Sequence, residues 1–186
     1  MTDAEVRATL LQWRDEKDRA FAQPGQSPIL ESDLDGFDGL RYFESDPALR
    51  FVLPVVPFES IDLVEMETSR GEPVAYERFG RLHFEVGGVA CRLTVYRDPG
   101  HGSLFLPFRD ATSGAETYGA GRYVDLEAER ADVVLDFNYA YNPFCAYSPQ
   151  WVCPVPPAEN TLSVAIRAGE RTFGEPRVAT GGRTGG

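Results

Sequence analysis

A chain of 186 residues falls within the usual size of one domain and is long enough to bury a core without disulfide or metal staples. Hydrophobic residues make up 42% of the chain and charged residues 25%, which excludes a disordered or fibrous protein. The formal net charge of -11 would repel a phosphate backbone, so nucleic acid is not an expected partner.

The amino terminus predicts a cytoplasmic protein. The segment from Met1 to Glu5 is acidic where a secretory signal would be basic, and no apolar run approaches the roughly 20 residues that span a bilayer. A soluble chain without a membrane partner is therefore expected. In a reducing compartment its three cysteines would be free thiols by default.

The first predicted element is an amphipathic helix over residues 3–23. Thr2 and Glu5 have the spacing of a capping box, and Pro24 with Gly25 ends the helix. Apolar residues recur at roughly helical intervals at Val6, Leu10, Trp13 and Phe21. We expect this stripe to pack on the outside of the main domain.

After a polar connector, short runs of β-branched and aromatic residues between turn residues predict about ten strands. The predicted strands are 40–43, 50–56, 61–67, 74–79, 81–86, 89–96, 103–108, 122–126, 133–137 and 162–167. Gly87-Gly88 reads as a hairpin turn, so successive strands should form an antiparallel meander. Such a meander closes into a barrel or stacks as a sandwich, and closure is favoured because it removes exposed edges. Residues 1–178 would form this single β-rich domain and residues 179–186 a disordered, glycine-rich tail.

A glycine-rich loop between two predicted strands carries Arg109 at one end and Arg122 at the other. Guanidinium groups beside exposed backbone N–H groups can bind a carboxylate or phosphate, so the loop is a candidate anion site. The alternative is that Arg109 pairs with Asp110, Asp125 or Asp136 and that the glycines only serve turns. No phosphate-binding or dinucleotide-binding glycine motif is present, and no cofactor is identified.

Residues 136–160 form an aromatic and proline-rich segment. Asn142-Pro143 ends a predicted strand, and five prolines between positions 143 and 157 hold an extended path. Rings with polar tips suit a small organic ligand, although the same rings could instead form a core. Together with the loop, this segment gives the candidate ligand-binding residues Arg109, Asp110, Ser113, Tyr118, Arg122, Tyr123, Asn138, Asn142 and Tyr147.

Cys145 and Cys153 are separated by seven residues, which is not a CxxC motif. Three readings stay open: a zinc site completed by His101 and an acidic residue, a reversible disulfide, and two reduced thiols packed among aromatics. The ligand count is poor for a metal, and no metal site is predicted. For catalysis the candidates are Cys145 as a nucleophile, or Asp136 with Glu159 as an acid–base pair.

The segments LFLPFRDATSG, VVLDFN, NPFCAY and PPAEN closely resemble a known family, the bacterial and archaeal domain-of-unknown-function family DUF1684. The resemblance extends over nearly the whole chain and includes the Trp13 helix and residues 39–43. It implies that the following residues belong to the family's pattern: Arg109, Asp110, Tyr118, Arg122, Asp136, Asn138, Asn142, Cys145, Cys153, Glu159 and Asn160. The family has no established activity, so the resemblance gives no residue a role.

The sequence therefore predicts a barrel that binds a small, anionic molecule. The alternative is an enzyme that uses the thiols of Cys145 and Cys153, or the carboxylates of Asp136 and Glu159.

Overall fold

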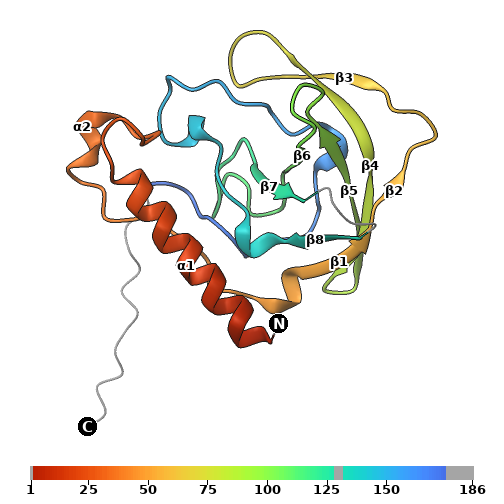
Figure 1. Cartoon of the computed structure of the whole chain (residues 1–186), viewed down its shortest axis with the longest axis horizontal. Coiled ribbons are helices and arrows are strands. Elements are labelled where there is room, and N and C mark those ends of the chain that lie inside the picture. Colours follow the sequence, from red (N-terminus) through yellow and green to blue (C-terminus); the bar gives the residue numbers. More distant parts are fainter. Residues whose placement is uncertain (1, 128–131, 175–186) are drawn as a thin grey trace.

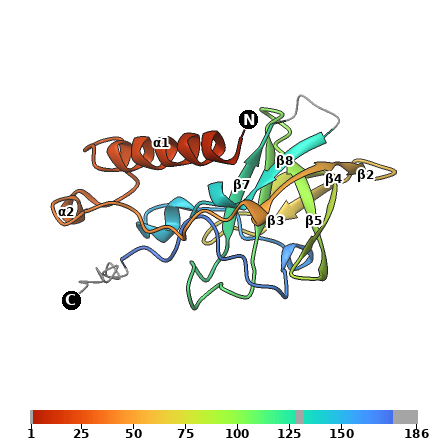
Figure 2. The ribbon, with the colours of Figure 1, turned by 90° about the horizontal axis from the view of Figure 1, so that it is seen from below.

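An N-terminal helix lies beside two antiparallel sheets in the computed structural model (Figures 1 and 2). The structure describes residues 2–127 and 132–174. The predicted tail, residues 179–186, lies outside the described residues. The chain is mainly β with one long helix, as the sequence predicts.

Helix α1 (Asp3–Phe21) confirms the predicted amphipathic helix. Thr2 is its N-cap, and the Thr2 hydroxyl and the Glu5 carboxylate complete the capping box in both directions. Of the predicted apolar stripe the helix buries Leu10 and Phe21, while Val6 and Trp13 are half-buried; it also buries Arg14. A short helix, α2 (Glu31–Leu34), follows it.

The larger sheet has six strands in the order β2-β4-β5-β6-β7, with β3 also paired to β4. Its members are β2 (Val56–Pro57), β3 (Leu63–Met66), β4 (Val74–Val86), β5 (Val89–Arg97), β6 (Leu104–Phe108) and β7 (Arg122–Leu126). Strands β1 (Arg50–Pro54) and β8 (Asp132–Asp136) form a separate antiparallel pair. Strands β4 to β7 follow one another as the predicted meander.

Both sheets enclose one hydrophobic core. Leu82 and Leu93 from the larger sheet and Val133 and Leu135 from β8 lie in the same buried cluster. Neither sheet closes on itself among the residues that the structure describes, so the predicted closed barrel is not seen. The shared core, rather than a continuous ring of hydrogen bonds, joins the two sheets.

The two predicted strands 74–79 and 81–86 form the single long strand β4, with a bulge between Arg78 and Gly80. Gly80 reads as a strand breaker in the sequence, but here it permits close packing. A Cβ at this position would lie 2.8 Å from the carbonyl oxygen of Val56 and 2.5 Å from the Val55 side chain. A glycine inside a strand therefore marks close backbone approach.

Two predicted strands do not form. Residues 40–43 contribute only an isolated bridge between Tyr42 and Glu170. Residues 162–167 are irregular. Leu162 and Val164 make only single backbone bonds with residues 109 and 111, and side chains bond the backbone at Ile166, where N donates to Asp110 and O accepts from Arg122. The 3-10 helices Pro47–Leu49, Phe137–Tyr139, Phe144–Ala146 and Ala158–Asn160 were not predicted.

Candidate functional site

Two charged residues of the glycine-rich loop, Asp110 and Arg122, are buried. Arg122 is 1% exposed and Asp110 5% exposed, and Arg122 Nη2 lies 3.4 Å from Asp110 Oδ1. Arg122 Nη1 also donates to the carbonyls of Ala168 and Glu170, and Nη2 to that of Ile166. The terminal nitrogens of Arg122 thus donate to backbone carbonyls and to Asp110 of the same chain. The guanidinium that was expected to bind an anion therefore has internal partners.

Asp110 completes this buried network. Its carboxylate accepts hydrogen bonds from Ile166 N at 2.6 Å and from the backbone and hydroxyl of Thr112. The Ser113 hydroxyl accepts a bond from Asp110 N at 3.1 Å and lies 3.4 Å from Asp110 Oδ1. The loop's polar groups therefore hold a turn against residues 166–170.

Arg109 lies apart from that network. Its side chain is half-buried and its Nε donates to the carbonyl of Ala120 at 3.3 Å, while its backbone pairs with Asn160 and Leu162. Within the described residues no ion pair joins Arg109 to Asp110, which the sequence offered as a partner. Of the two arginines, Arg109 is the one whose guanidinium lies nearer the surface.

Asn138 and Asp136 hydrogen-bond around Asp46, in the segment that leads into strand β1. Asn138 Oδ1 accepts from Asp46 N at 2.8 Å, and its Nδ2 donates to Asp46 O and to Asp136 Oδ1. Asn138 is 4% exposed, and its carbonyl accepts from Arg14 of α1. These bonds are all internal, which gives Asn138 a structural place.

Asn142 and Tyr147 converge on a carboxylate that sequence reasoning missed. Glu170 is fully buried and accepts from Asn142 N at 3.0 Å, from the Tyr147 hydroxyl and from Lys17 Nζ at 2.5 Å. The Lys17 ammonium also lies 4.9 Å from the centre of the Tyr141 ring. A buried charge needs such partners, so this cluster ties α1 to the core.

No charge pattern in the sequence marks Glu170 or Lys17. Lys17 is one of several charged residues on a helix of mixed sign, and Glu170 follows a predicted strand that does not form. The available signal is Gly169, which has a φ of +74° and whose Cβ would lie 2.4 Å from the carbonyl of Ala140. This close approach brings Glu170 N to within 2.8 Å of the same carbonyl.

The two cysteines of the aromatic segment lie side by side. Cys145 N donates to Cys153 Sγ at 3.4 Å, which places the two residues in direct contact. The Tyr118 hydroxyl, from the glycine-rich loop, donates to Cys145 Sγ at 3.6 Å. Cys145 is half-buried, Cys153 is buried, and both are free thiols. The loop and the aromatic segment therefore do meet, at sulfur rather than at an arginine.

Hydrogen bonds shift the pKa values of the two thiols in opposite directions. The bond from Cys153, and then those from Tyr118 and Ser69, outweigh burial and lower the pKa of Cys145 to about 6. The same bond to Cys145 raises the pKa of Cys153 above its ordinary range. Burial, followed by the bond to Cys145, raises the pKa of Tyr118 to about 12, so its hydroxyl keeps its proton and donates. The arrangement therefore favours the thiolate form at Cys145 and the protonated form at Cys153.

Backbone pairing fixes the position of Cys153. Ser69 N donates to Cys153 O at 2.7 Å, Cys153 N donates to the Ser69 hydroxyl, and Thr68 bridges to Pro154. The Tyr123 hydroxyl donates to the carbonyl of Pro154, so this predicted ligand-binding residue also has an internal partner. Pro154, next to Cys153, is thus held from two sides.

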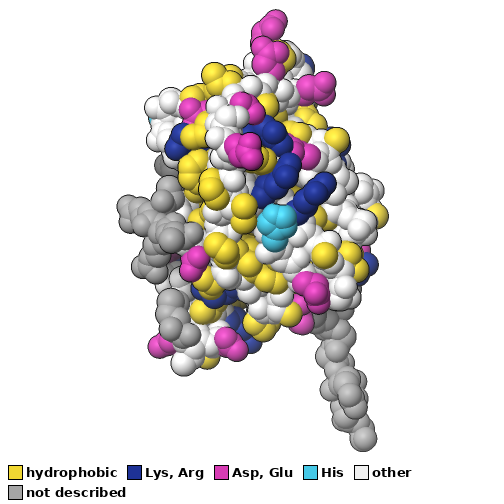
Figure 3. Space-filling view, turned by 90° about the vertical axis from the view of Figure 1, so that its right-hand side faces the viewer, with side chains coloured by type: hydrophobic (Ala, Val, Ile, Leu, Met, Phe, Trp, Pro, Cys, Tyr) yellow, Lys and Arg dark blue, Asp and Glu magenta, His cyan; other side chains and the backbone are white. Residues whose placement is uncertain are grey.

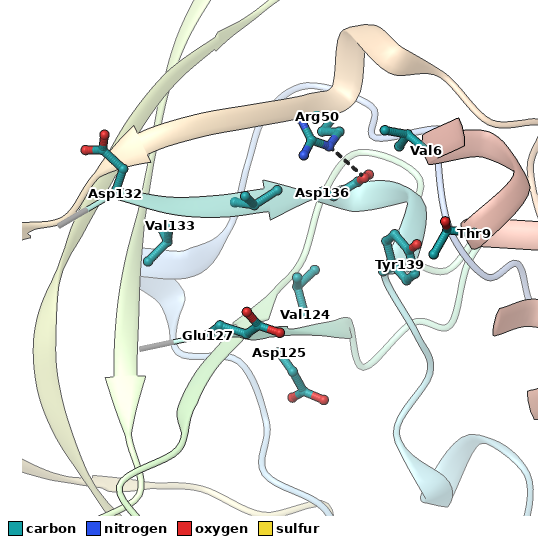
Figure 4. A pocket seen from close by; sticks show the side chains of 11 residues that line it. Val6, Thr9, Arg50, Val124, Asp125, Glu127, Asp132, Val133, Asp136 and Tyr139 are labelled. Atoms are coloured by element: carbon teal, nitrogen blue, oxygen red, sulfur yellow. Dashed lines mark ion pairs between the residues drawn. The ribbon is translucent and has the colours of Figure 1, made fainter. Parts of the chain in front are cut away.

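Asp136 borders a cleft of about 450 Å³ between α1 and strands β7 and β8 (Figure 4). Its carboxylate lies 3.5 Å from Arg50 Nε and accepts from Asn138 N at 2.9 Å. Figure 4 shows Arg50 and Asp136 pointing toward one another from β1 and β8. The cleft is separate from the thiols: Cys145, Cys153 and Tyr118 are not among the residues that line it.

Glu159 belongs to another face of the molecule. It forms two hydrogen bonds with Arg78, at 3.1 and 2.7 Å, and accepts from the Tyr96 hydroxyl at 2.6 Å. The side that carries β4 shows basic side chains gathered near a histidine (Figure 3). Among the described residues no contact joins Glu159 to Asp136, so the structure does not bring the predicted acid–base pair together.

Among the described residues, no contact joins His101 to Cys145 or Cys153, as the zinc-site reading would require. It lies in the exposed turn after β5 and its Nδ1 is 3.3 Å from Asp98. Within residues 2–127 and 132–174, no three side chains of His, Cys, Asp or Glu are grouped to hold a metal ion. In the same described part, no helix has the length and apolar character needed to span a membrane.

This structure defines a mainly β protein with one N-terminal helix and a hydrogen-bonded thiol pair. The chain belongs to the family described as protein of unknown function (DUF1684), whose model matches residues 35–171. The resemblance seen in the sequence is thereby confirmed. The comparison with curated proteins gave no match.

A solved structure supports the same assignment. The chain is similar to an uncharacterized protein of Haloarcula marismortui, whose structure was determined by solution NMR. The two sequences are 44% identical, the match covers 94% of this chain and 98% of that one, and the TM-score is 0.71.

Proposed function

We propose that the chain performs thiol–disulfide exchange, with Cys145 as the attacking thiolate and Cys153 as the resolving thiol. The observation that carries this proposal is the convergence of the two cysteines and the Tyr118 hydroxyl at one point. A thiolate is the reactive form of cysteine, and donors around the sulfur favour that form at neutral pH. Cys145 is the half-buried member of the pair, which suits the attacking role.

The exchange would proceed in two steps. Cys145 Sγ attacks one sulfur of a substrate disulfide, the substrate's S–S bond breaks, and the other substrate sulfur leaves as a thiolate that takes up a proton from solvent. Cys153 then loses its proton and attacks Cys145 Sγ, which releases the second substrate thiol and forms the Cys145–Cys153 disulfide. The substrate gains two electrons and the protein loses two. An external dithiol would restore the reduced pair by the reverse exchange.

The small anionic ligand predicted from Arg109 and Arg122 has weaker support. Arg122 binds carbonyls and Asp110 in the interior, and Asn138, Asn142 and Tyr147 have internal partners as well. Only Tyr118, of the predicted ligand-binding residues, faces a reactive group. The thiol alternative of the sequence analysis is therefore preferred to the anion site.

The pH dependence of alkylation tests the thiolate. The rate at which iodoacetamide modifies Cys145 is expected to rise with pH and level off above a midpoint near 6, because the thiolate is the reactive form. Replacing Cys153 with alanine removes the strongest donor, so the midpoint should move up toward the ~8.5 of a free cysteine. Tyr118→Phe should shift it in the same direction by less.

Cys91 provides the internal control. It is buried on β5, and burial raises the pKa of its thiol. Peptide mapping after alkylation should find Cys145 modified first at pH 7 and Cys91 only after unfolding. A midpoint for Cys145 above about 8 in the wild-type chain, unchanged by Cys153→Ala, would contradict the proposal.

A further inference from the structure

Three exposed apolar side chains, Phe144, Trp151 and Val152, flank the thiol pair and are here called the apolar rim. They are 43%, 37% and 50% exposed, respectively. Phe144 directly precedes Cys145 and Val152 directly precedes Cys153, so the rim borders both thiols along the chain. Large apolar groups that stay in water beside a reactive group are typical of a binding surface.

The rim is held in one arrangement. Trp151 Nε1 donates to the carbonyl of Pro28 at 2.9 Å, which fixes the indole against the segment that joins α1 to α2. The rings of Phe144 and Trp151 meet edge to face with centroids 5.2 Å apart, and Phe144 also contacts Phe21 of α1 at 6.4 Å. An anchored aromatic surface loses little conformational entropy when a partner binds.

Electrostatics selects among disulfide substrates. The chain carries a formal net charge of -11, and the exposed Glu67 belongs to the segment whose backbone pairs with Cys153 and Val155. A small disulfide with carboxylates would be repelled by this field. A polypeptide segment that is apolar and not negatively charged avoids this repulsion and is long enough to contact several rim side chains at once.

We infer that the substrate of the thiol pair is a disulfide in an apolar, neutral or basic polypeptide segment, which docks on the apolar rim. This inference rests on the thiol function proposed above and names its substrate class. The contact places the substrate's S–S bond at Cys145, while the apolar side chains next to it bury Trp151 and Val152.

The test uses the reduced full-length chain and two synthetic peptides of equal length, each closed by the same disulfide. One peptide flanks the disulfide with leucine, valine and lysine, and the other with aspartate and serine. Second-order rate constants are measured in single turnover, with hydroxyethyl disulfide as a small neutral probe. The apolar peptide should react at least about tenfold faster than the acidic one, since a single well-placed apolar contact contributes a factor of that size.

Variants of the rim then assign this selectivity. Trp151→Ala and Val152→Ser should each bring the rate ratio of the two peptides down toward one. Val52→Ser is the matched control, because Val52 is 59% exposed on β1 and has no place in the rim. It should leave the ratio unchanged. Val152→Ser removes no hydrogen bond, so it remains informative even if Trp151→Ala fails to fold.

The outcomes separate the two proposals. If the wild-type chain reduces hydroxyethyl disulfide but treats both peptides alike, or if the rim variants keep the wild-type ratio, the substrate inference is overturned and the thiol function stands. If the wild-type chain reduces none of the three disulfides, the thiol function itself is overturned.

Discussion

Replacing Asp110 with asparagine is expected to lower the free energy of unfolding by about 3 to 5 kcal/mol, the range seen when one partner of a buried ion pair is removed. The Asp110 side chain is fully buried, and both of its oxygens accept from donors only. An amide nitrogen in place of Oδ2 would face Ile166 N, and in place of Oδ1 would face Arg122. Urea denaturation followed by circular dichroism measures the change.

Asp15→Asn is the matched control for this substitution. The Asp15 side chain is 69% exposed and pairs with Arg19 on the surface of α1 at 2.8 Å. Exposed pairs of this kind contribute about 0.5 kcal/mol or less. Equal losses of stability for Asp110→Asn and Asp15→Asn would show that the buried network does not support the fold in the way described.

The second large effect is expected at the thiol pair. In the Cys153→Ala variant, a disulfide reagent should leave Cys145 as a lasting mixed disulfide, because no resolving thiol remains. In the wild-type chain Cys153 Sγ lies 3.4 Å from the backbone nitrogen of Cys145, so its attack is intramolecular and the mixed disulfide should decay at least about a hundredfold faster. Quenching at low pH and measuring the intact mass over time distinguishes the two courses.

Two further variants control this experiment. Cys91→Ala should behave like the wild-type chain, since Cys91 lies on β5 and contacts Val89 rather than the other cysteines. Cys145→Ala should form little adduct, because the two remaining thiols, Cys91 and Cys153, are both buried. A mixed disulfide that clears equally fast in Cys153→Ala and wild type would exclude Cys153 as the resolving residue.

Local patterns predicted much of the fold. The capping box at Thr2, the turn at Gly87-Gly88 and the alternating strands carry their information within a few residues, and α1 and the strand meander appear as expected. The error at residues 162–167 has a non-local cause. The backbone there is bonded by Asp110 and Arg122, which lie more than 40 positions away in the chain.

In the candidate site, too, the sequence indicated residue types but not the long-range contacts between them. The sequence offered Cys145, Cys153 and Tyr118 as candidate site residues, but it could not show that Tyr118 reaches Cys145 across 27 positions. It offered Arg122 as a ligand-binding residue because a guanidinium looks the same in a sequence whether its donors face a ligand or buried carbonyls. Burial, which decides between those uses, depends on packing of distant segments.

The most direct test of the thiol function is the intact mass of the reduced wild-type chain after reaction with one equivalent of hydroxyethyl disulfide and an acid quench. The proposed exchange predicts that each chain loses two hydrogen atoms and carries no adduct. Subsequent alkylation of the unfolded protein should then label Cys91 and leave Cys145 and Cys153 unlabelled. An unchanged mass with all three cysteines open to alkylation would contradict the account.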